Sequence, residues 1–108
     1  MLNPPIGVKA TTLSSSSIIL TWTDSTLGRN QRVTDGREYT VSYAPTSGAH
    51  RAREKKSAAP NMLIDDLRPN TKYEFSVKVA KAGIESVWSM TAENTTFEES
   101  KLVEREKE

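Results

Sequence analysis

The sequence predicts an all-β fold, a sandwich of two antiparallel sheets, and three observations lead to this prediction. From Lys72 to Val79 every second residue is apolar, which is the period of a half-buried strand. Similar short stretches recur along the chain, with turn-forming residues between them. The length of 108 residues is enough for one domain with a single core. We therefore expect a seven-stranded sandwich with Greek-key connections.

The residues before the long strand predict a specific kind of corner. Pro69 and Asn70 supply a turn between the two sheets, and Tyr73 follows directly at the start of the strand. A tyrosine at this place can anchor its hydroxyl to the upstream backbone, as in the tyrosine corner of immunoglobulin-like sandwiches. The expected fold is therefore immunoglobulin-like.

Seven stretches of the chain carry the strand signal. Pro4 and Pro5 mark the entry, because proline cannot donate to a ladder and suits a sheet edge. We expect Trp22 at the centre of the core, and Tyr39 and Val41 on the inward face of the third strand. The expected strands cover residues 7–13, 17–23, 37–45, 50–57, the region around 62–64, 72–79 and 91–97, with a turn over 81–86.

The chain contains no cysteine, so neither a disulfide nor a thiolate metal site stabilises it, and cysteine usage leaves the compartment open. Residues 98–108 carry five acidic and three basic side chains, a net charge of −2, which leaves +3 on residues 1–97. We expect the domain to cover residues 4–97, and residues 98–108 to form a charged tail or an interdomain linker. No run of 18 apolar residues spans a membrane, and MLNPPIGV lacks the features of a secretory signal. We expect a piece of a longer protein, whose signal and anchor lie outside it.

Nothing in the residue pattern indicates an enzyme. His50 is the one histidine, and there is no cysteine to accompany it as a metal ligand. Asp65 and Asp66 are adjacent, but neighbouring side chains on a strand point to opposite faces, so a solvated pair is favoured over a cation site. The serines at 14–17 have no base to activate them, and no glycine-rich phosphate loop follows a strand. We therefore expect neither catalysis nor a cofactor nor a bound metal.

A basic cluster, HRAREKK at residues 50–56, is a candidate site for a polyanion. Arg51, Arg53 and Lys55 share one face if the segment is an edge strand, and Lys56 adds further charge. The second loop and third strand can extend this surface through Arg29, Arg32 and Arg37. Two structural interpretations compete: charges protect an exposed sheet edge from pairing, and surface charge keeps a domain soluble. Nucleic acid is a poor partner, because its binding needs a more basic domain and aromatic platforms.

Several motifs in this order resemble a known family. PP followed by a valine, LTW, YTVSY, DDLRPNTKYEFSVKV and a WS pair before the last strand resemble a fibronectin type III domain over residues 4–97. The segments PPIGVKA, ILTWTD, REYTV, NTKYEFSVKVAK and VWSMTAENTTFE resemble more narrowly the membrane-proximal fibronectin type III domains of the netrin receptor family, which includes DCC, neogenin and Frazzled. The fifth domain of these receptors is the most similar.

This resemblance implies an extracellular, non-enzymatic ligand-binding module of a single-pass plasma-membrane receptor in axon guidance, monomeric when isolated. The implied partners are a protein ligand such as netrin or a repulsive guidance molecule, and heparan sulfate bound by the basic surface. The resemblance also implies that Val8 and Met90 form an apolar ligand contact. The alternative is that both pack under the first strand. Trp88 either stacks with arginine side chains or covers the end of the core, and the second reading is favoured.

Asn94, Thr95 and Thr96 form an N-x-T glycosylation sequon. It lies within a predicted strand, so we expect Asn94 to be unmodified. Two other functions remain open. The domain could be a structural spacer that sets the distance between other modules, or an intracellular scaffold module similar to those of muscle proteins.

Overall fold

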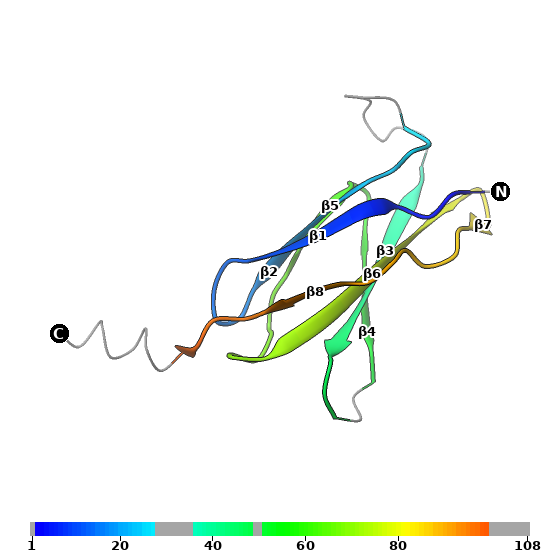
Figure 1. Ribbon diagram of the computed structural model, residues 1–108. Helices are drawn as coiled ribbons and strands as arrows, with labels where there is room; N and C mark the ends of the chain where they lie inside the picture. Colours follow the sequence, from blue (N-terminus) through cyan, green and yellow to red (C-terminus); the bar gives the residue numbers. More distant parts are fainter. Residues whose placement is uncertain (1, 28–35, 49–50, 100–108) are drawn as a thin grey trace.

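The computed structural model describes residues 2–27, 36–48 and 51–99, which form two antiparallel sheets packed face to face (Figure 1). The first sheet has the order β1-β2-β5, made by β1 (Ile6–Thr12), β2 (Ile18–Thr23) and β5 (Asn61–Ile64). In the second sheet β4 pairs with β3, β3 pairs with β6, and β7 and β8 both pair with β6. Its strands are β3 (Glu38–Pro45), β4 (Arg53–Ser57), β6 (Lys72–Lys81), β7 (Ile84–Glu85) and β8 (Ala92–Thr95). The predicted all-β sandwich is confirmed.

The core lies between the sheets and is built by the predicted alternation. Phe75, Val77 and Val79 on β6 are fully buried, because β6 pairs with β3 over eight residue pairs and its inward face meets the other sheet. Trp22 is 6% exposed and packs edge-on against Tyr39, with the ring centroids 5.4 Å apart. The other buried hydrophobic residues are Ile18, Leu20, Val41, Tyr43, Met62, Ile64, Leu67 and Tyr73.

The corner before β6 has the predicted geometry. The Tyr73 hydroxyl accepts a hydrogen bond from the Arg68 backbone N–H at 2.8 Å. Asn70 adopts a positive φ of 49°, a conformation that asparagine tolerates better than most residues, and so completes the turn. Leu67 is buried beneath this corner. The tyrosine corner is therefore present and fixes the position of Arg68.

The last strand, expected over 91–97, is present as β8, but the segment before it differs from the expected turn. Both β7 and β8 pair with β6, and residue 85 pairs with Ala80 while Ala92 pairs with Phe75. From residue 85 to residue 92 the chain advances seven positions, while the paired part of β6 advances five. The segment between β7 and β8 therefore cannot pair with β6 in a regular ladder. The expected turn over 81–86 therefore contains the two-residue strand β7. In addition, β4 begins at Arg53, later than expected, and His50 lies outside the described residues.

Candidate ligand-binding surfaces

A groove of about 360 Å³ lies between the start of β1 and the segment that joins β7 to β8. Figure 1 places these two segments at the same end of the sandwich. The groove is lined by Pro4, Pro5, Ile6, Gly7, Val8, Trp88, Ser89, Met90 and Thr91. In β1 the pairing register with β2 shifts between Ile6 and Lys9, and Gly7 supplies the positive φ of 62° there. The first wall of the groove is thus an irregular part of β1.

Serine side chains hold the second wall in place. Ser89 donates its backbone N–H to the Val77 carbonyl at 2.8 Å and accepts the Val77 N–H on its hydroxyl oxygen at 2.9 Å. Its hydroxyl then donates to the Met90 carbonyl at 3.0 Å. Ser86 makes the same pair of bonds with Val79, at 2.8 and 3.0 Å. The segment is therefore tied to β6 although it forms no regular strand.

The structure brings Val8 and Met90 to the same groove. Val8 is partly buried and packs against the core, so the packing interpretation holds for this residue. Met90 is 90% exposed, so the packing interpretation is wrong for it. Ile6 lines the groove as well and is 55% exposed. Sequence reasoning missed Ile6, although an apolar residue directly after a proline pair was an available signal.

The expectation that Trp88 covers the end of the core is wrong. Trp88 is 39% exposed and lies beside the groove. The Lys78 ammonium lies 4.8 Å from the centre of its ring, a cation–π contact, and also 3.2 Å from Glu85. The stacked cation is a lysine of the neighbouring strand β6, and not an arginine. The Lys78 ammonium thus covers one face of the Trp88 ring.

The basic cluster divides into separate parts. Arg53 pairs with Tyr43 and Lys55 with Val41, so both share one face as predicted, but this is the face that carries the core. The Lys55 ammonium lies 3.3 Å from the carboxylate of Asp65, which follows β5 of the other sheet. Inward-pointing charge on an edge strand protects it from pairing with another chain. Lys55 therefore has a structural role at the open side of the sandwich.

Lys56 lies on the opposite face of β4 from Arg53 and Lys55. It pairs with Thr40 in the register, and its ammonium lies 3.6 Å from the Glu38 carboxylate. Both side chains of this ion pair are more than half exposed, so it contributes little to stability. The expected continuous basic face over β4 is therefore interrupted by two ion pairs.

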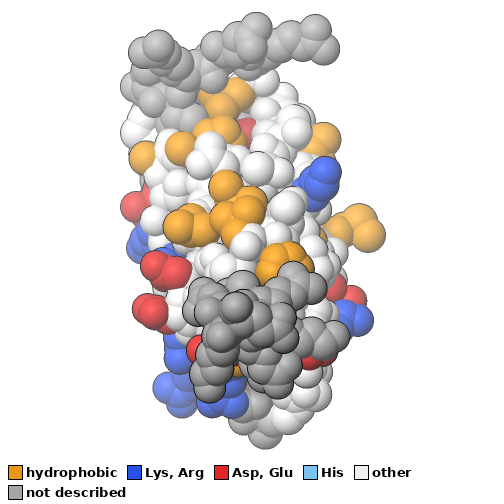
Figure 2. Space-filling model, turned by 90° about the vertical axis from the view of Figure 1, so that its left-hand side faces the viewer, with side chains coloured by type: hydrophobic (Ala, Val, Ile, Leu, Met, Phe, Trp, Pro, Cys, Tyr) orange, Lys and Arg blue, Asp and Glu red, His pale blue; other side chains and the backbone are white. Residues whose placement is uncertain are grey.

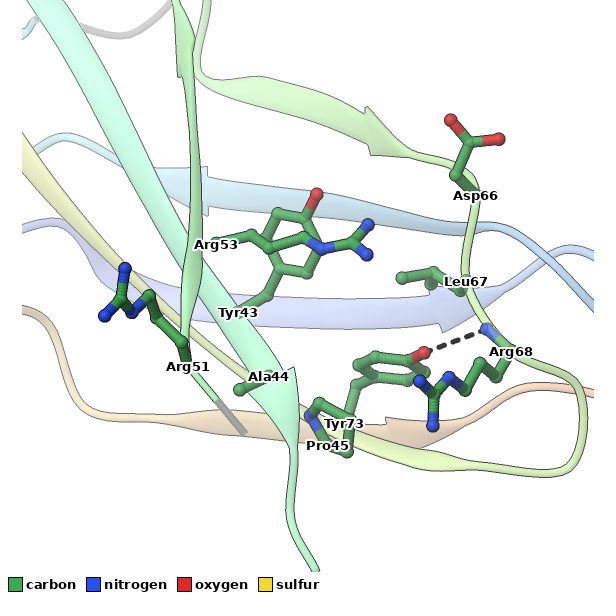
Figure 3. Close-up of a pocket in the computed structure, with 9 residues that line it drawn as sticks. All are labelled: Tyr43, Ala44, Pro45, Arg51, Arg53, Asp66, Leu67, Arg68 and Tyr73. Atoms are coloured by element: carbon green, nitrogen blue, oxygen red, sulfur yellow. Dashed lines mark hydrogen bonds between the residues drawn. The ribbon is translucent and has the colours of Figure 1, made fainter. Parts of the chain in front are cut away.

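Three arginines surround a second pocket, of about 150 Å³, beside the tyrosine corner. Arg51, Arg53 and Arg68 line it together with Tyr43 and Tyr73, and its remaining lining residues are Ala44, Pro45, Asp66 and Leu67. Figure 3 shows Arg53 extending toward Leu67, Arg68 beside Tyr73, and Arg51 directed away from the centre. None of the three arginines forms an ion pair with another described residue. We call the pocket that these three arginines line the arginine pocket.

Arg68 was not predicted as part of the basic surface. It lies in the corner before Tyr73, and the fold brings it beside residues that come 15 and 17 positions earlier in the chain. Figure 2 shows Lys and Arg side chains gathered at the lower edge of the face that it presents, at the height where Figure 1 places the end of the β3–β4 hairpin. Arg51, Arg53 and Arg68 thus lie together beside the tyrosine corner.

Arg37 does not extend the basic surface, and this prediction is wrong. Its side chain is 4% exposed, and its Nη1 lies 2.7 Å from the Asp24 carboxylate, which also accepts the Tyr39 hydroxyl at 2.8 Å. Burial raises the pKa of Asp24, but hydrogen bonds from Thr26, Tyr39 and Arg37 outweigh burial and hold the pKa below its usual value. The predicted contributions of Arg29 and Arg32 lie outside the described residues.

Asn94 uses its side-chain amide within the fold. The amide nitrogen donates to the Ala10 carbonyl at 2.8 Å, and the neighbouring Thr12 hydroxyl donates to the Thr95 carbonyl at 2.8 Å. These two bonds connect β1 with β8 and close the side of the sandwich beyond the groove. Thr96, the third sequon residue, is buried. The expectation that Asn94 is unmodified stays a prediction.

The described residues contain neither a metal-binding cluster nor a helix that could cross a membrane. Over residues 2–27, 36–48 and 51–99 no three His, Cys, Asp or Glu side chains cluster closely enough to hold a metal ion. The same part of the chain contains no helix with the length and apolar character that a membrane crossing needs.

Comparison with known proteins agrees with this architecture. The family model of the fibronectin type III domain matches residues 3–95. Human neogenin is 45% identical over 96 residues, and the human netrin receptor DCC is 36% identical over 96 residues. Each match covers 88% of this chain and 7% of the relative, so the chain spans a small part of these proteins.

Solved structures show the same fold. A segment of titin has a TM-score of 0.73 at 26% identity, covering 91% of this chain and 33% of the segment. The FN5 domain of Drosophila Lar has a TM-score of 0.71 at 20% identity, covering 90% of this chain and 98% of that domain. With the family match over residues 3–95, these similarities establish that the chain belongs to the fibronectin type III domain family.

Proposed function

We propose that this domain is an extracellular ligand-binding module of a netrin-type axon-guidance receptor, in the extracellular part of a single-pass plasma-membrane protein. Its ligand is a protein such as netrin or a repulsive guidance molecule, which docks on the groove that contains Val8 and Met90. The observation behind this proposal is the 90% exposure of Met90 at the groove. The similarity to neogenin and to the netrin receptor DCC supports the assignment.

The groove has the physical properties of an apolar contact site. Moving a methionine side chain from water into an interface contributes about 1.5–3 kcal/mol. The flexible, polarizable thioether of Met90 adapts to the shape of a partner, and Ile6 extends the exposed apolar surface beside it. Such central apolar anchors act mainly by slowing dissociation. The serine bonds that fix the Ser89 backbone reduce the ordering cost of binding.

A second function, binding of heparan sulfate, rests on the arginine pocket. Arg51, Arg53 and Arg68 make no ion pair with a described residue, so their charge is available to an anion. Guanidinium groups bind sulfate and carboxylate groups with two hydrogen bonds each. The same charge attracts acidic ligands over a distance, and this attraction weakens as the salt concentration rises.

Two alternative functions make different predictions. A structural spacer binds no ligand through these surfaces, so substitutions at Met90 or at the arginine pocket leave binding of every partner unchanged. An intracellular scaffold module would resemble muscle proteins such as titin. This chain is 26% identical to the titin segment and 45% identical to human neogenin, and this difference favours the receptor assignment.

Binding to immobilised netrin tests the groove. Met90→Ser is compared with Val87→Ser, since Val87 is 73% exposed but does not line the groove. We expect Met90→Ser to weaken binding about tenfold, which corresponds to about 1.4 kcal/mol, and Val87→Ser to bind like the wild type. Equal binding by the wild type and both variants, with the fold intact, would support the spacer alternative.

Binding to immobilised heparin across a salt series tests the arginine pocket. The Arg53→Ser/Arg68→Ser variant is compared with Lys9→Ser/Lys72→Ser, which removes the same charge elsewhere. We expect the arginine variant to lose most of the salt-sensitive binding and the lysine variant to keep it. Equal losses in the two variants would mean that net charge, and not the pocket, determines binding.

A further inference from the structure

Met90 presents its thioether sulfur to solvent from a fixed backbone. Its side chain is 90% exposed, more than any other large hydrophobic side chain in the described part of the chain. The exposure does not come from a loose chain end, because Ser89 is bonded to Val77 on both its backbone and its hydroxyl and also donates to the Met90 carbonyl. An oxidant in solution can therefore reach the sulfur while the domain stays folded.

The chain provides an internal contrast. Met62 lies on β5 and is 9% exposed within the core, so the surrounding side chains shield its sulfur. Susceptibility of methionine to oxidation depends on access of the oxidant to the sulfur. Met90 and Met62 have the same chemistry and differ in exposure, and we expect their reaction rates in the folded chain to differ accordingly.

We propose that Met90 is a modification site: oxidation of its thioether by a peroxide weakens binding of the protein ligand at the groove. This inference rests on the proposed function of the groove. The sulfur lone pair attacks one oxygen of hydrogen peroxide, an S–O bond forms and the O–O bond breaks. The second oxygen leaves as hydroxide and takes up the proton of the transferred oxygen, giving water. Sulfur loses two electrons and the peroxide is reduced.

The sulfoxide changes the contact, and not the fold. It converts a flexible apolar side chain into a polar one, whose oxygen loses its water without gaining a partner when an apolar surface covers it. We expect an affinity about tenfold lower after oxidation. The core is unaffected, since the exposed Met90 side chain contributes no packing there. Methionine sulfoxide reductases reverse the reaction, so the modification can be removed.

Peptide mapping by mass spectrometry tests the modification site. The folded chain is treated with hydrogen peroxide, and sulfoxide formation is followed at each methionine, with a parallel sample in urea. We expect Met90 to react at least about tenfold faster than Met62 in the folded chain, and at a similar rate in urea. Equal rates of the two residues in the folded chain would overturn the assignment.

Binding to immobilised netrin before and after peroxide treatment tests the consequence. The wild type and Met62→Leu should both lose affinity about tenfold on oxidation, because each keeps Met90. Met90→Leu should show no further loss relative to its own untreated sample. A loss in Met90→Leu equal to that of the wild type would place the effect at another residue and overturn the proposal.

Failure of this inference can be distinguished from failure of the proposed function. If Met90→Ser weakens netrin binding but the Met90 sulfoxide binds like the thioether, the groove assignment stands and the oxidation proposal is wrong. If Met90→Ser binds like the wild type, the groove assignment itself fails and the oxidation proposal fails with it. Thermal unfolding of the oxidised chain confirms in either case that the fold is intact.

Discussion

The Asp24 carboxylate and the Arg37 guanidinium form an ion pair of 2.7 Å that is almost completely buried. The two residues lie at the two ends of the long second loop, one after β2 and one before β3. Asp24 also accepts hydrogen bonds from the Thr26 backbone and the Tyr39 hydroxyl. This ion pair therefore fixes both ends of the loop on the sandwich, whatever the sequence between them.

Replacing Arg37 by alanine should destabilise the domain strongly. The substitution leaves the buried Asp24 carboxylate without its cation, a change that costs about 3–5 kcal/mol in other proteins. Urea unfolding measures the effect. Lys56→Ala is the control, because it breaks an exposed ion pair with Glu38 and should cost less than about 1 kcal/mol. Similar losses in the two variants would contradict the structural role of the buried pair.

The stability of the domain should fall in acid through Asp24. The folded-state pKa of Asp24 lies below the usual value of 3.8 that applies to the unfolded chain. Its contribution is therefore complete above about pH 4 and is lost as the pH falls through the folded-state pKa. Urea unfolding over pH 2 to 6 should show a weaker acid dependence in Asp24→Asn than in the wild type.

Tyr73→Phe should destabilise the domain by about 1–2 kcal/mol. The substitution removes the hydroxyl that accepts the Arg68 N–H and leaves this partly buried donor without its partner. Tyr43→Phe is a matched control, because its hydroxyl makes no hydrogen bond within the described residues. Thermal or urea unfolding compares the two variants. A larger loss in Tyr43→Phe would show that the corner bond is not the important interaction.

Ser89→Ala should cost about 1–3 kcal/mol, since the buried Val77 N–H loses its acceptor. Hydrogen exchange at the Val77 amide should accelerate, and netrin binding should weaken because Met90 is no longer held in place. Ser16→Ala, which removes an exposed hydroxyl, is the control. If Ser89→Ala is as stable as the wild type and its Val77 amide stays protected, the hydroxyl is not required to hold this segment.

Local patterns were sufficient to predict most of the fold. Alternation located β6 and its buried residues, and the Pro69–Asn70 turn before Tyr73 predicted the corner, because both signals depend on neighbours within a few positions. The short strand β7 and the serine-bonded segment after it were not predicted. They depend on serine hydroxyls that replace backbone acceptors, and a serine in the sequence gives no sign of which donor it will meet.

The candidate sites were predicted less completely, because they depend on contacts between distant residues. The sequence grouped Arg37 with the surface arginines, but burial beside Asp24 could not be read from charge alone. It also left out Arg68, which joins Arg51 and Arg53 only after the corner has folded. The resemblance to netrin receptors pointed to Val8 and Met90, and the fold places them at one groove, although only Met90 is fully exposed.

The side-by-side arrangement of β1 and β8 has a mechanical consequence. Ala10 bonds to Asn94 and Thr12 to Thr95, so the first and last strands run in the same direction and leave the sandwich at opposite ends. Tension applied between the two ends pulls β1 along β2 and β8 along β6. The ladder bonds lie across this direction and are loaded together, and do not open one after another. Bonds loaded together in this way resist stretching of the domain along its length.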